Sequence, residues 1–304
     1  MNYKQHLENK IFKIISQAAQ ELNLESYVIG GFVRDILLDR NHKKDIDIVA
    51  VGSGIELAIK VSELLPNHPK VQVFKNYGTA MLRYKEMDIE FVGARKESYT
   101  HDSRNPLVEI GTLKDDQERR DFTINAMAFS LNSDNFGDLV DPFNGVSDLE
   151  NKILKTPLHP DITYSDDPLR MMRAARFASQ LNFEIEEATL SAMKDMATRI
   201  SIVSAERVRD EFTKLLMSSN ARRGISIMVD TGLAALVIPE IPKLKLEIDE
   251  HHHHKDVYEH SITVLEQAIA HEERLGGANL IIRLAALLHD IGKPKTRSLI
   301  AGGG

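Results

Sequence analysis

Two carboxylates that leave the same face of one short strand restrict how this chain can fold. Asp45-Ile46-Asp47-Ile48-Val49 alternates with a period of two, which predicts a half-buried strand with both aspartates on one face. Carboxylates held this close raise each other's pKa unless a cation lies between them, and a hard ion such as Mg²⁺ prefers oxygen ligands. An isolated Asp-x-Asp is more often a solvated strand end, so the surrounding residues decide between the two interpretations.

The residues before this strand favour a metal site. A short strand pattern ends at Gly30-Gly31, and a helix is expected at once, near residues 33–38. Glycines let backbone N–H groups approach a phosphate, and a helix N-terminus favours negative charge. A metal pair beside a phosphate cradle suits phosphoryl or nucleotidyl transfer. The expected third carboxylate is Glu90, on the strand predicted over 87–92, with Asp88 on the same face as the alternative.

Hydrophobic periodicity divides the chain into a mixed part and a helical part. An amphipathic helix is expected over residues 7–22, and further strand patterns lie at 71–74, 80–84 and 87–92. This mixture predicts an α/β domain to about residue 150. Beyond Asp167 the apolar spacing is helical, and a polar tract at 247–254 marks a boundary before a last helical segment.

Composition narrows the class of protein. A net charge of −7 over 304 residues, with 42% hydrophobic residues, excludes a disordered chain. The absence of cysteine excludes disulfides and thiolate zinc sites. We expect a cytoplasmic protein with no membrane contact, because no signal peptide and no apolar run of about 18–20 residues is present.

These features belong to a longer ordered series of motifs. Gly30-Gly31-Phe32-Val33-Arg34-Asp35 and Asp45-Ile46-Asp47 resemble the head domain of the bacterial CCA-adding tRNA nucleotidyltransferase and poly(A) polymerase family. The resemblance continues through Arg119-Arg120-Asp121-Phe122-Thr123-Ile124-Asn125-Ala126-Met127-Ala128, Asp141-Pro142-Phe143-Asn144-Gly145, Asp148-Leu149, Asp167-Pro168-Leu169-Arg170 and Ser204-Ala205-Glu206-Arg207. An ordered set of this length is highly specific.

The resemblance implies a fold class and three domains. We expect an α/β nucleotidyltransferase head of the polymerase-β-like kind at 1–153 and an all-α, RNA-binding neck and body at 154–250. Tyr258-Glu259-His260-Ser261 and His289-Asp290-Ile291-Gly292-Lys293-Pro294 resemble the start of an HD phosphohydrolase domain, expected at 251–304. Such a site holds its metal with a His, a His-Asp pair and a later Asp. Because no later Asp follows, His260, His289 and Asp290 are candidate ligands of an incomplete site.

The resemblance also implies the chemistry of the head. Residues that match Asp45 and Asp47 hold two Mg²⁺ ions, and the carboxylate that matches Glu90 helps to place the attacking hydroxyl. An RNA 3′-hydroxyl then attacks the α-phosphate of a nucleoside triphosphate and pyrophosphate leaves. Guanidinium groups bind phosphate in a planar fork; for Arg120, a surface position or a pair with Asp121 is the alternative. The expected nucleotide and phosphate site comprises Gly30, Gly31, Arg34, Arg119, Arg120, Asp121 and Asn125.

Base recognition is assigned by the resemblance to Asp167, Arg170 and Arg173. Asp167 and Arg170 share a helix face at i, i+3, so an intrahelical salt bridge is the alternative. A carboxylate acceptor beside a guanidinium donor complements cytosine and adenine, whereas uracil and guanine present the reversed pattern. The family's signature begins Glu-Asp where this chain has Asp166-Asp167, so the role of Asp166 stays open.

Two further segments concern the RNA. The stretch between Arg95 and Leu113 resembles the flexible loop of adenine-adding members, which favours CCA or A addition; an ordinary solvent loop is the alternative. Cations spread over residues 170–223 predict a grip on the RNA backbone, although the acids between them equally fit a solvated helix face. The candidates are Arg176, Arg207 and Arg209.

The sequence therefore predicts a CCA-adding tRNA nucleotidyltransferase that uses tRNA, CTP, ATP and Mg²⁺. A poly(A) polymerase acting on other RNA 3′ ends is the nearest alternative. An HD-type metal-dependent phosphohydrolase with a nucleotide-binding head is the alternative from another class, and a non-catalytic RNA-binding protein is the third.

Overall fold

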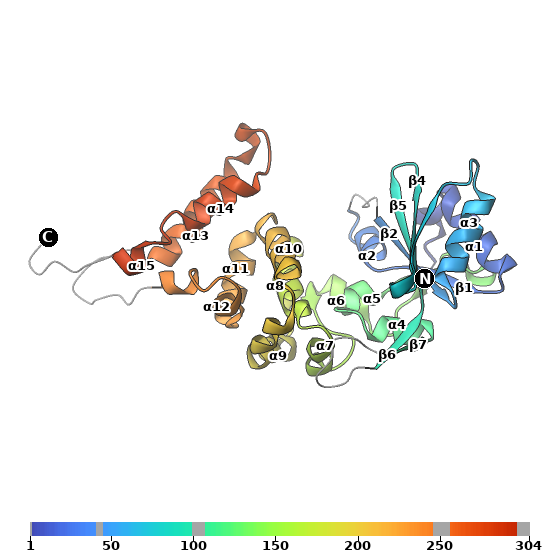
Figure 1. Cartoon of the computed structure of the whole chain (residues 1–304), viewed down its shortest axis with the longest axis horizontal. Coiled ribbons are helices and arrows are strands. Elements are labelled where there is room, and N and C mark those ends of the chain that lie inside the picture. Colours follow the sequence, from blue (N-terminus) through green and yellow to red (C-terminus); the bar gives the residue numbers. More distant parts are fainter. Residues whose placement is uncertain (1, 41–44, 99–106, 246–255, 297–304) are drawn as a thin grey trace, which may run out of the picture. The chain divides into compact units, whose positions relative to one another are not determined.

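The computed structural model describes residues 2–40, 45–98, 107–245 and 256–296. The chain folds as two compact units, Met1–Asp166 and Asp167–Gly304 (Figure 1). The first unit is a mixed sheet with helices and the second is almost entirely helical, as the sequence predicts. Among the described residues, no helix is long and apolar enough to cross a membrane.

A seven-stranded sheet in the order β3-β4-β5-β2-β1-β8-β9 forms the centre of the first unit. Its strands are β1 (Glu25–Ile29), β2 (Asp45–Val51), β3 (Val71–Phe74), β4 (Thr79–Tyr84), β5 (Met87–Gly93), β8 (Ala128–Ser130) and β9 (Leu139–Val140). β2 and β5 run parallel, and the other neighbouring strands are antiparallel. The strands expected from the two-residue periodicity are confirmed.

The helices of the first unit are α1 (Lys10–Glu21), α2 (Gly31–Leu37), α3 (Gly54–Leu64), α4 (Leu113–Glu118), α5 (Thr123–Ala126), α6 (Gly145–Glu150) and α7 (Pro160–Asp166). Shorter elements are the hairpin β6 (Arg95–Ser98) and β7 (Leu107–Ile110), the strand β10 (Ile153–Leu154), and the 3₁₀ turns η1 (Lys4–Leu7), η2 (Lys75–Tyr77) and η3 (Ser133–Asn135). The amphipathic α1 begins after Asn9, whose side chain accepts a hydrogen bond from the Ile11 amide at 3.2 Å. Its apolar stripe, which includes Ile15, is buried.

The sheet presents the two aspartates on the face that α4 covers. Val49 of β2 packs in an apolar cluster with Tyr27 of β1 and Leu113 of α4. Because side chains alternate along a strand, Asp45 and Asp47 leave this same face. Ile46 and Ile48, which alternate with the aspartates, are buried on the opposite face. The apolar residues of β2 therefore anchor the strand that carries the two aspartates.

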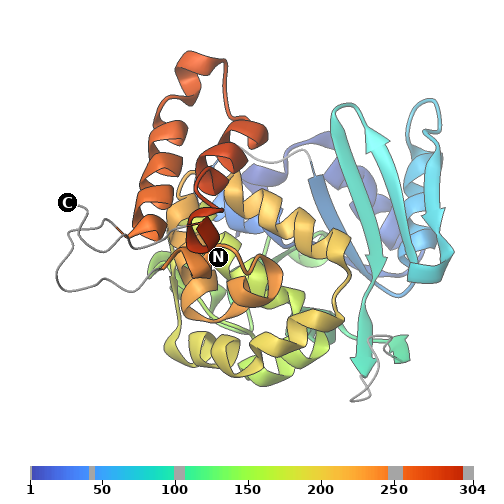
Figure 2. The same cartoon turned by 60° about the vertical axis from the view of Figure 1, so that its left-hand side comes forward.

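The second unit consists of stacked helices, shown in yellow to red in Figure 2. They are α8 (Leu169–Leu181), α9 (Glu187–Met196), α10 (Ala205–Leu216), α11 (Ala221–Asp230), α12 (Leu233–Val237), α13 (Val257–Ala270), α14 (Leu280–Leu288) and α15 (Lys293–Thr296), with β11 (Glu184–Ile185) and the 3₁₀ turns η4 (Ala197–Ile202), η5 (Pro242–Leu244) and η6 (Glu272–Leu275). α8 packs against α10 and α11. Gly224 permits this approach, because a Cβ there would lie 2.8 Å from Leu215 Cγ and 2.9 Å from Ser179 Oγ.

The compact units do not coincide with the three expected domains. The division falls between Asp166 and Asp167, and α13 to α15 belong to the same unit as the helices before them. Arg283 of α14 contributes to this, since its guanidinium bonds Glu272 and the carbonyls of Leu216 and Ser218. The expected boundaries at 153/154 and 250/251 therefore stay predictions about domain identity.

Candidate active site

Gly30 is the point at which three of the expected motifs meet. It ends β1 with φ 82° and ψ −137°, a backbone conformation that only glycine adopts without strain. Its amide donates to the Met127 carbonyl at 3.3 Å. A Cβ at this position would lie 3.1 Å from Arg120 Nη1 and 3.3 Å from Asp47 Oδ2. The diglycine turn, the acidic strand and Arg120 of the arginine pair therefore converge on one backbone position.

The carboxylates of β2 and β5 lie at matching levels of the sheet. In the parallel register Asp47 is paired with Glu90 and Asp45 with Asp88. Desolvation and the charge of Asp47 raise the pKa of Glu90, while Arg95 opposes the shift. Asp88 lies 3.8 Å from Arg83 in an ion pair, so Glu90 is the better third carboxylate.

The donor set of this site fits a hard divalent ion, although its oxygens are not gathered as closely as we expected. Two aspartates and a glutamate offer only carboxylate oxygens, the ligand type that Mg²⁺ prefers. Among the described residues, however, the carboxylates of Asp45, Asp47 and Glu90 do not form a group with all ligand atoms within 4.8 Å of one another. The three are neighbours in the sheet, on β2 and β5, without their oxygens forming one close group.

Arg119 and Arg120 are both held by Asp116, a residue that the sequence analysis did not identify. Asp116 Oδ1 accepts from Arg119 Nε at 2.9 Å and from Arg119 Nη2, and Oδ2 accepts from Arg120 Nε and Nη2, each at 3.2 Å. Burial alone raises the pKa of Asp116, but the charges and hydrogen bonds of the two arginines outweigh it and lower the pKa. The expected alternative partner of Arg120, Asp121, is not the one that pairs with it. The i, i+3 and i, i+4 spacing from Asp116 was the available signal.

Three of the expected phosphate ligands form a buried network instead. Arg34 is 2% exposed, and its guanidinium donates to Asp35 Oδ1 at 2.7 and 2.9 Å and to Asn125 Oδ1 at 2.8 Å. Asn125 donates in turn to Asp121 Oδ1 at 3.0 Å, and both side chains are 6% exposed. Burial makes these side chains a brace between α2 and the 119–127 segment. Their assignment to the nucleotide and phosphate site stays a prediction.

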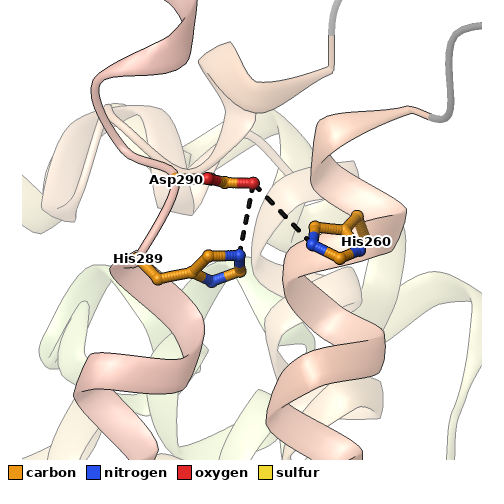
Figure 3. Close-up of side chains that lie close together, drawn as sticks. All are labelled: His260, His289 and Asp290. Atoms are coloured by element: carbon orange, nitrogen blue, oxygen red, sulfur yellow. Dashed lines mark ion pairs between the residues drawn. The ribbon is translucent and has the colours of Figure 1, made fainter.

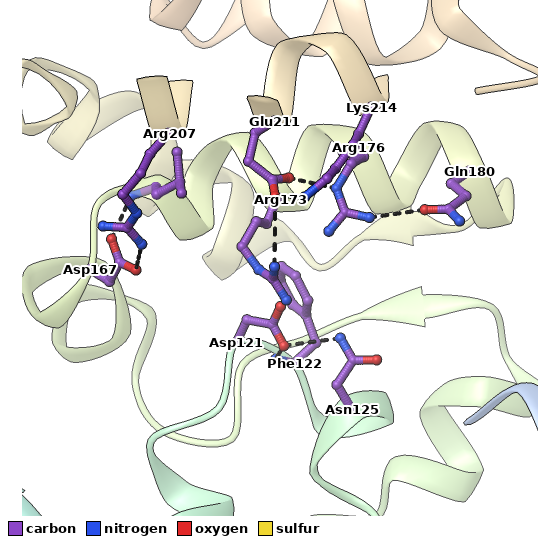
Figure 4. Close-up of polar contacts among 11 residues, drawn as sticks. Asp121, Phe122, Asn125, Asp167, Arg173, Arg176, Gln180, Arg207, Glu211 and Lys214 are labelled. Atoms are coloured by element: carbon purple, nitrogen blue, oxygen red, sulfur yellow. Dashed lines mark hydrogen bonds and ion pairs between the residues drawn. The ribbon is translucent and has the colours of Figure 1, made fainter. Parts of the chain in front are cut away.

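In the second unit, Asp167 is positioned by the start of α8 and by α10. Its Oδ1 accepts from the Leu169 amide at 3.1 Å, and its Oδ2 lies 2.7 Å from Arg207 Nη2 (Figure 4). Arg170 is 9% exposed, and Arg173 lies 3.8 Å from Glu211. A residue that we assigned to RNA binding, Arg207, is therefore a direct partner of the expected base-reading carboxylate.

The expected RNA-binding cations differ in exposure. Arg176 is buried, with Nε 2.6 Å from Glu211 Oε2 and Nη1 2.9 Å from Gln180 Oε1 (Figure 4). Its guanidinium also lies over the Phe177 ring. Its assignment to RNA binding stays a prediction, which these contacts inside the helical bundle do not favour. Arg209 is exposed beside Asp210 and stays a candidate. Of the expected flexible loop, residues 99–106 lie outside the described residues.

A separate cluster joins α13 to the end of α14. His260, His289 and Asp290 have ligand atoms all within 4.8 Å of one another, the only such group of three or more in the described part (Figure 3). Asp290 Oδ2 lies 3.2 Å from His289 Nε2 and 3.8 Å from His260 Nε2, and Lys293 Nζ bonds it at 2.6 Å. Burial raises the pKa of Asp290, but the Lys293 hydrogen bond and the histidine and lysine charges outweigh it and lower the pKa. The sequence prediction that these residues come together is confirmed.

Family comparisons match three consecutive segments. Residues 26–155 match the poly A polymerase head domain. Residues 182–244 match the probable RNA and SrmB-binding site of polymerase A, and residues 257–301 match the HD domain.

Curated relatives share much of this chain. A CCA-adding enzyme of Lactobacillus helveticus (strain DPC 4571) is 38% identical over 222 residues, which cover 72% of this chain and 53% of that enzyme. An A-adding tRNA nucleotidyltransferase of Aquifex aeolicus (strain VF5) is 42% identical over 187 residues, 61% of this chain and 22% of that enzyme. This chain spans about half the length of the CCA-adding enzymes it matches.

Solved structures agree with the sequence relatives. A complex of a CCA-adding enzyme with CTP has a TM-score of 0.77 and 28% identity, covering 98% of this chain and 66% of that one. A tRNA nucleotidyltransferase complexed with a primer tRNA and an incoming ATP analog has a TM-score of 0.74 and 28% identity, covering 91% of this chain and 75% of that one.

Proposed function

Because this chain belongs to the family of poly A polymerases and CCA-adding enzymes, we propose that it adds CMP and AMP from CTP and ATP to the 3′ end of tRNA. The observation that carries the proposal is the convergence at Gly30 of Asp47 and Arg120. A carboxylate and a guanidinium beside a side-chain-free backbone position suit a metal-bound triphosphate. An RNA-binding protein without catalysis has no use for the neighbouring carboxylates.

Different residues of the head have different roles in nucleotide transfer. Asp45 and Asp47 would hold Mg²⁺, which supplies charge neutralisation for the attacking and leaving oxygens. Glu90, with its raised pKa, accepts a hydrogen bond from the RNA 3′-hydroxyl and orients it. The 3′-hydroxyl gives its proton to Glu90, and the 3′-oxygen forms a bond to the α-phosphorus as the bond from the α-phosphorus to the bridging oxygen breaks. Pyrophosphate leaves with the electron pair. Arg119 and Arg120 bind the triphosphate.

The choice of nucleotide is assigned to Asp167, Arg170 and Arg173. Asp167 accepts from the exocyclic amino group that cytosine and adenine share, and a guanidinium donates to the adjacent ring nitrogen. Uracil and guanine place a carbonyl and an N–H there, so like groups would face each other without water. Burial of the Arg170 side chain supports the proposal, because a desolvated donor discriminates more strongly than an exposed one.

The test supplies the full chain with Mg²⁺, tRNA that lacks its 3′ CCA, and each nucleotide alone or in pairs. CTP alone is expected to add two residues, and ATP is expected to add one residue only after CTP. The same tRNA with its 3′ diol oxidised by periodate is the control and must not be extended. Failure to use CTP, combined with long additions of AMP, would replace this proposal with poly(A) synthesis. A cytosolic location stays a prediction.

A second candidate function rests on the cluster of His260, His289 and Asp290, which is already assembled. We propose that it binds a divalent transition metal, for which imidazole and carboxylate are suitable ligands. Substitution of Asp45 and Asp47 by asparagine should abolish transfer and leave metal binding by this cluster unchanged. H260A should abolish metal binding by this cluster and leave nucleotide transfer unchanged. If H260A leaves the bound metal content of the chain unaltered, the cluster is not a metal site.

A further inference from the structure

The face of the sheet that carries the acidic residues continues beyond the candidate site over β4 and β3. In the register of the strands, Glu90 of β5 is paired with Met81 of β4, and Met81 is paired with Gln72 of β3. Because Asp47 is paired with Glu90, these four residues form one row across four neighbouring strands. Side chains alternate along a strand, so Phe74 lies on the same face, two residues beyond Gln72. The row leads from the candidate site to the edge of the sheet.

This part of the face is exposed, whereas the opposite face is buried. α3 packs against β4 and β5, and alternate side chains of these two strands are fully buried: Ala80, Leu82, Ile89 and Phe91. On the face with Glu90, Gln72 is exposed, Met81 is half-buried and Phe74 is 45% exposed. Phe74 and Met81 are diagonal neighbours across the two strands, a separation that aromatic and long side chains bridge. An aromatic ring and a thioether are therefore presented together beside Glu90.

The two sides of Asp47 carry different parts of the candidate site. On the β1 side Asp47 is paired with Ile29, and the next residue, Gly30, has Arg120 beside it. On the β5 side Asp47 is paired with Glu90. In-line transfer requires the attacking hydroxyl and the leaving pyrophosphate on opposite sides of the α-phosphorus. A triphosphate held on the β1 side therefore leaves the β5 side, and the exposed face beyond it, to the RNA.

We propose that Gln72, Phe74 and Met81 seat the last unpaired bases of the RNA 3′ end, with Phe74 as the stacking platform; the proposal rests on the proposed function. Neighbouring strands lie about 4.8 Å apart, so β3 is roughly 10 Å from Glu90, a distance that one nucleotide spans. Single-stranded RNA is bound on exposed sheets through aromatic side chains that stack on its bases. Arg83, two residues from Met81 on this face, has a 71% exposed side chain and supplies a cation for the RNA backbone.

The experiment measures AMP addition by the full chain to tRNA that lacks only its terminal adenosine. F74A is expected to raise KM for this tRNA by about tenfold, the effect of losing one base stack, while KM for ATP at saturating tRNA stays unchanged. F74Y keeps an aromatic ring and should retain the wild-type KM. V73A is the matched control, because Val73 lies on the same strand, is 38% exposed and belongs to the opposite face. It should leave KM for the tRNA unaltered.

Photo-cross-linking gives a readout that does not depend on transfer. The same tRNA, with 4-thiouridine as its 3′-terminal nucleotide, is irradiated in complex with the full wild-type chain, and the cross-linked peptides are mapped. The proposal expects cross-links in β3 and β4. Cross-links that are absent from both strands overturn it, wherever else they occur.

Each outcome decides the proposal. An F74A variant with the KM for tRNA of V73A overturns it, and so does an equal rise in KM for tRNA and for ATP. If thermal unfolding shows that F74A does not fold, the cross-links of the wild type decide. Failure of the wild type to transfer any nucleotide would overturn the proposed function, while cross-links in β3 and β4 would still support this RNA contact. Normal transfer without those cross-links would overturn the RNA contact alone.

Discussion

Gly30 shows how one residue without a side chain can organise a site. Its positive φ excludes most residues, and the space beside it is shared by Arg120 and Asp47. An alanine at this position meets both a backbone penalty and two polar atoms that must shift. The backbone conformation and the neighbouring polar atoms therefore both require glycine at this position.

We expect G30A to reduce nucleotide transfer by at least about a hundredfold, because Arg120 and Asp47 must both move, and to cost about 1–3 kcal/mol of stability. Rates of CTP incorporation and urea unfolding measure the two effects. G78A is the matched control, since Gly78 also has a positive φ of 62° but nothing within 4 Å of its Cβ position. A G30A variant with the transfer rate of G78A would contradict the account of this turn.

Tyr27 provides a pH test of the core of the first unit. Burial and the hydrogen bond to Glu25 raise its pKa to about 12, against an ordinary value of 10.0. Above pH 10 the unfolded chain loses this proton while the folded chain keeps it, so the contribution to stability falls as pH rises from 10 to 12. Between about pH 9 and about pH 11, the free energy of unfolding measured in urea should fall less in Y27F than in the wild type. Equal losses in both proteins would show that Tyr27 does not carry the effect.

At the scale of elements, hydrophobic periodicity predicted the strands that carry the site. Which arginines are buried and which are exposed depends on packing, which the periodicity does not show. The alternation around Asp45 and Glu90 identified β2 and β5, and their parallel register brings Asp47 level with Glu90. Sequence spacing could not show that Arg34 and Arg176 are buried, because it does not reveal the distant partners Asn125 and Glu211 that hold them in the interior. Asp116 was missed although its spacing to Arg119 and Arg120 was a usable signal, because spacing alone does not show that its carboxylate is fully buried.

The pairing of α8 with α10 leads to a prediction about nucleotide choice. Arg207 of α10 orients Asp167 at the start of α8 through a 2.7 Å contact. R207A should therefore raise KM for CTP and ATP several-fold and permit misincorporation of UTP, while its stability changes by less than about 1 kcal/mol. The rate of single-nucleotide addition with each of the four triphosphates measures this.

R209A is the matched control for R207A, because Arg209 lies on the same helix, is exposed, and pairs only with its neighbour Asp210 among the contacts that the structure gives it. We expect R209A to alter KM for tRNA and to leave nucleotide choice intact. If R207A and R209A add the four nucleotides at the same relative rates, Asp167 does not have the proposed base-reading role.

At the scale of the whole molecule, the chain combines two units of different design. The first unit carries the carboxylates on a rigid sheet, and the second carries the base-reading candidates and the metal cluster on helices. The buried pair of Arg283 and Glu272 connects the last helices to the carbonyls that follow α10. The helices that match the HD domain are therefore part of the fold of the second unit, whatever the activity of their cluster.

The central claim is that Asp45 and Asp47 support transfer of a nucleotide to RNA. The direct measurement is incorporation of radiolabelled CMP into tRNA lacking its 3′ CCA by the wild type, D45N and D47N, with thermal unfolding confirming that all three are folded. The wild type should extend the tRNA in the presence of Mg²⁺, and each variant should lose at least about a thousandfold in rate. Folded variants that transfer CMP as fast as the wild type would contradict it.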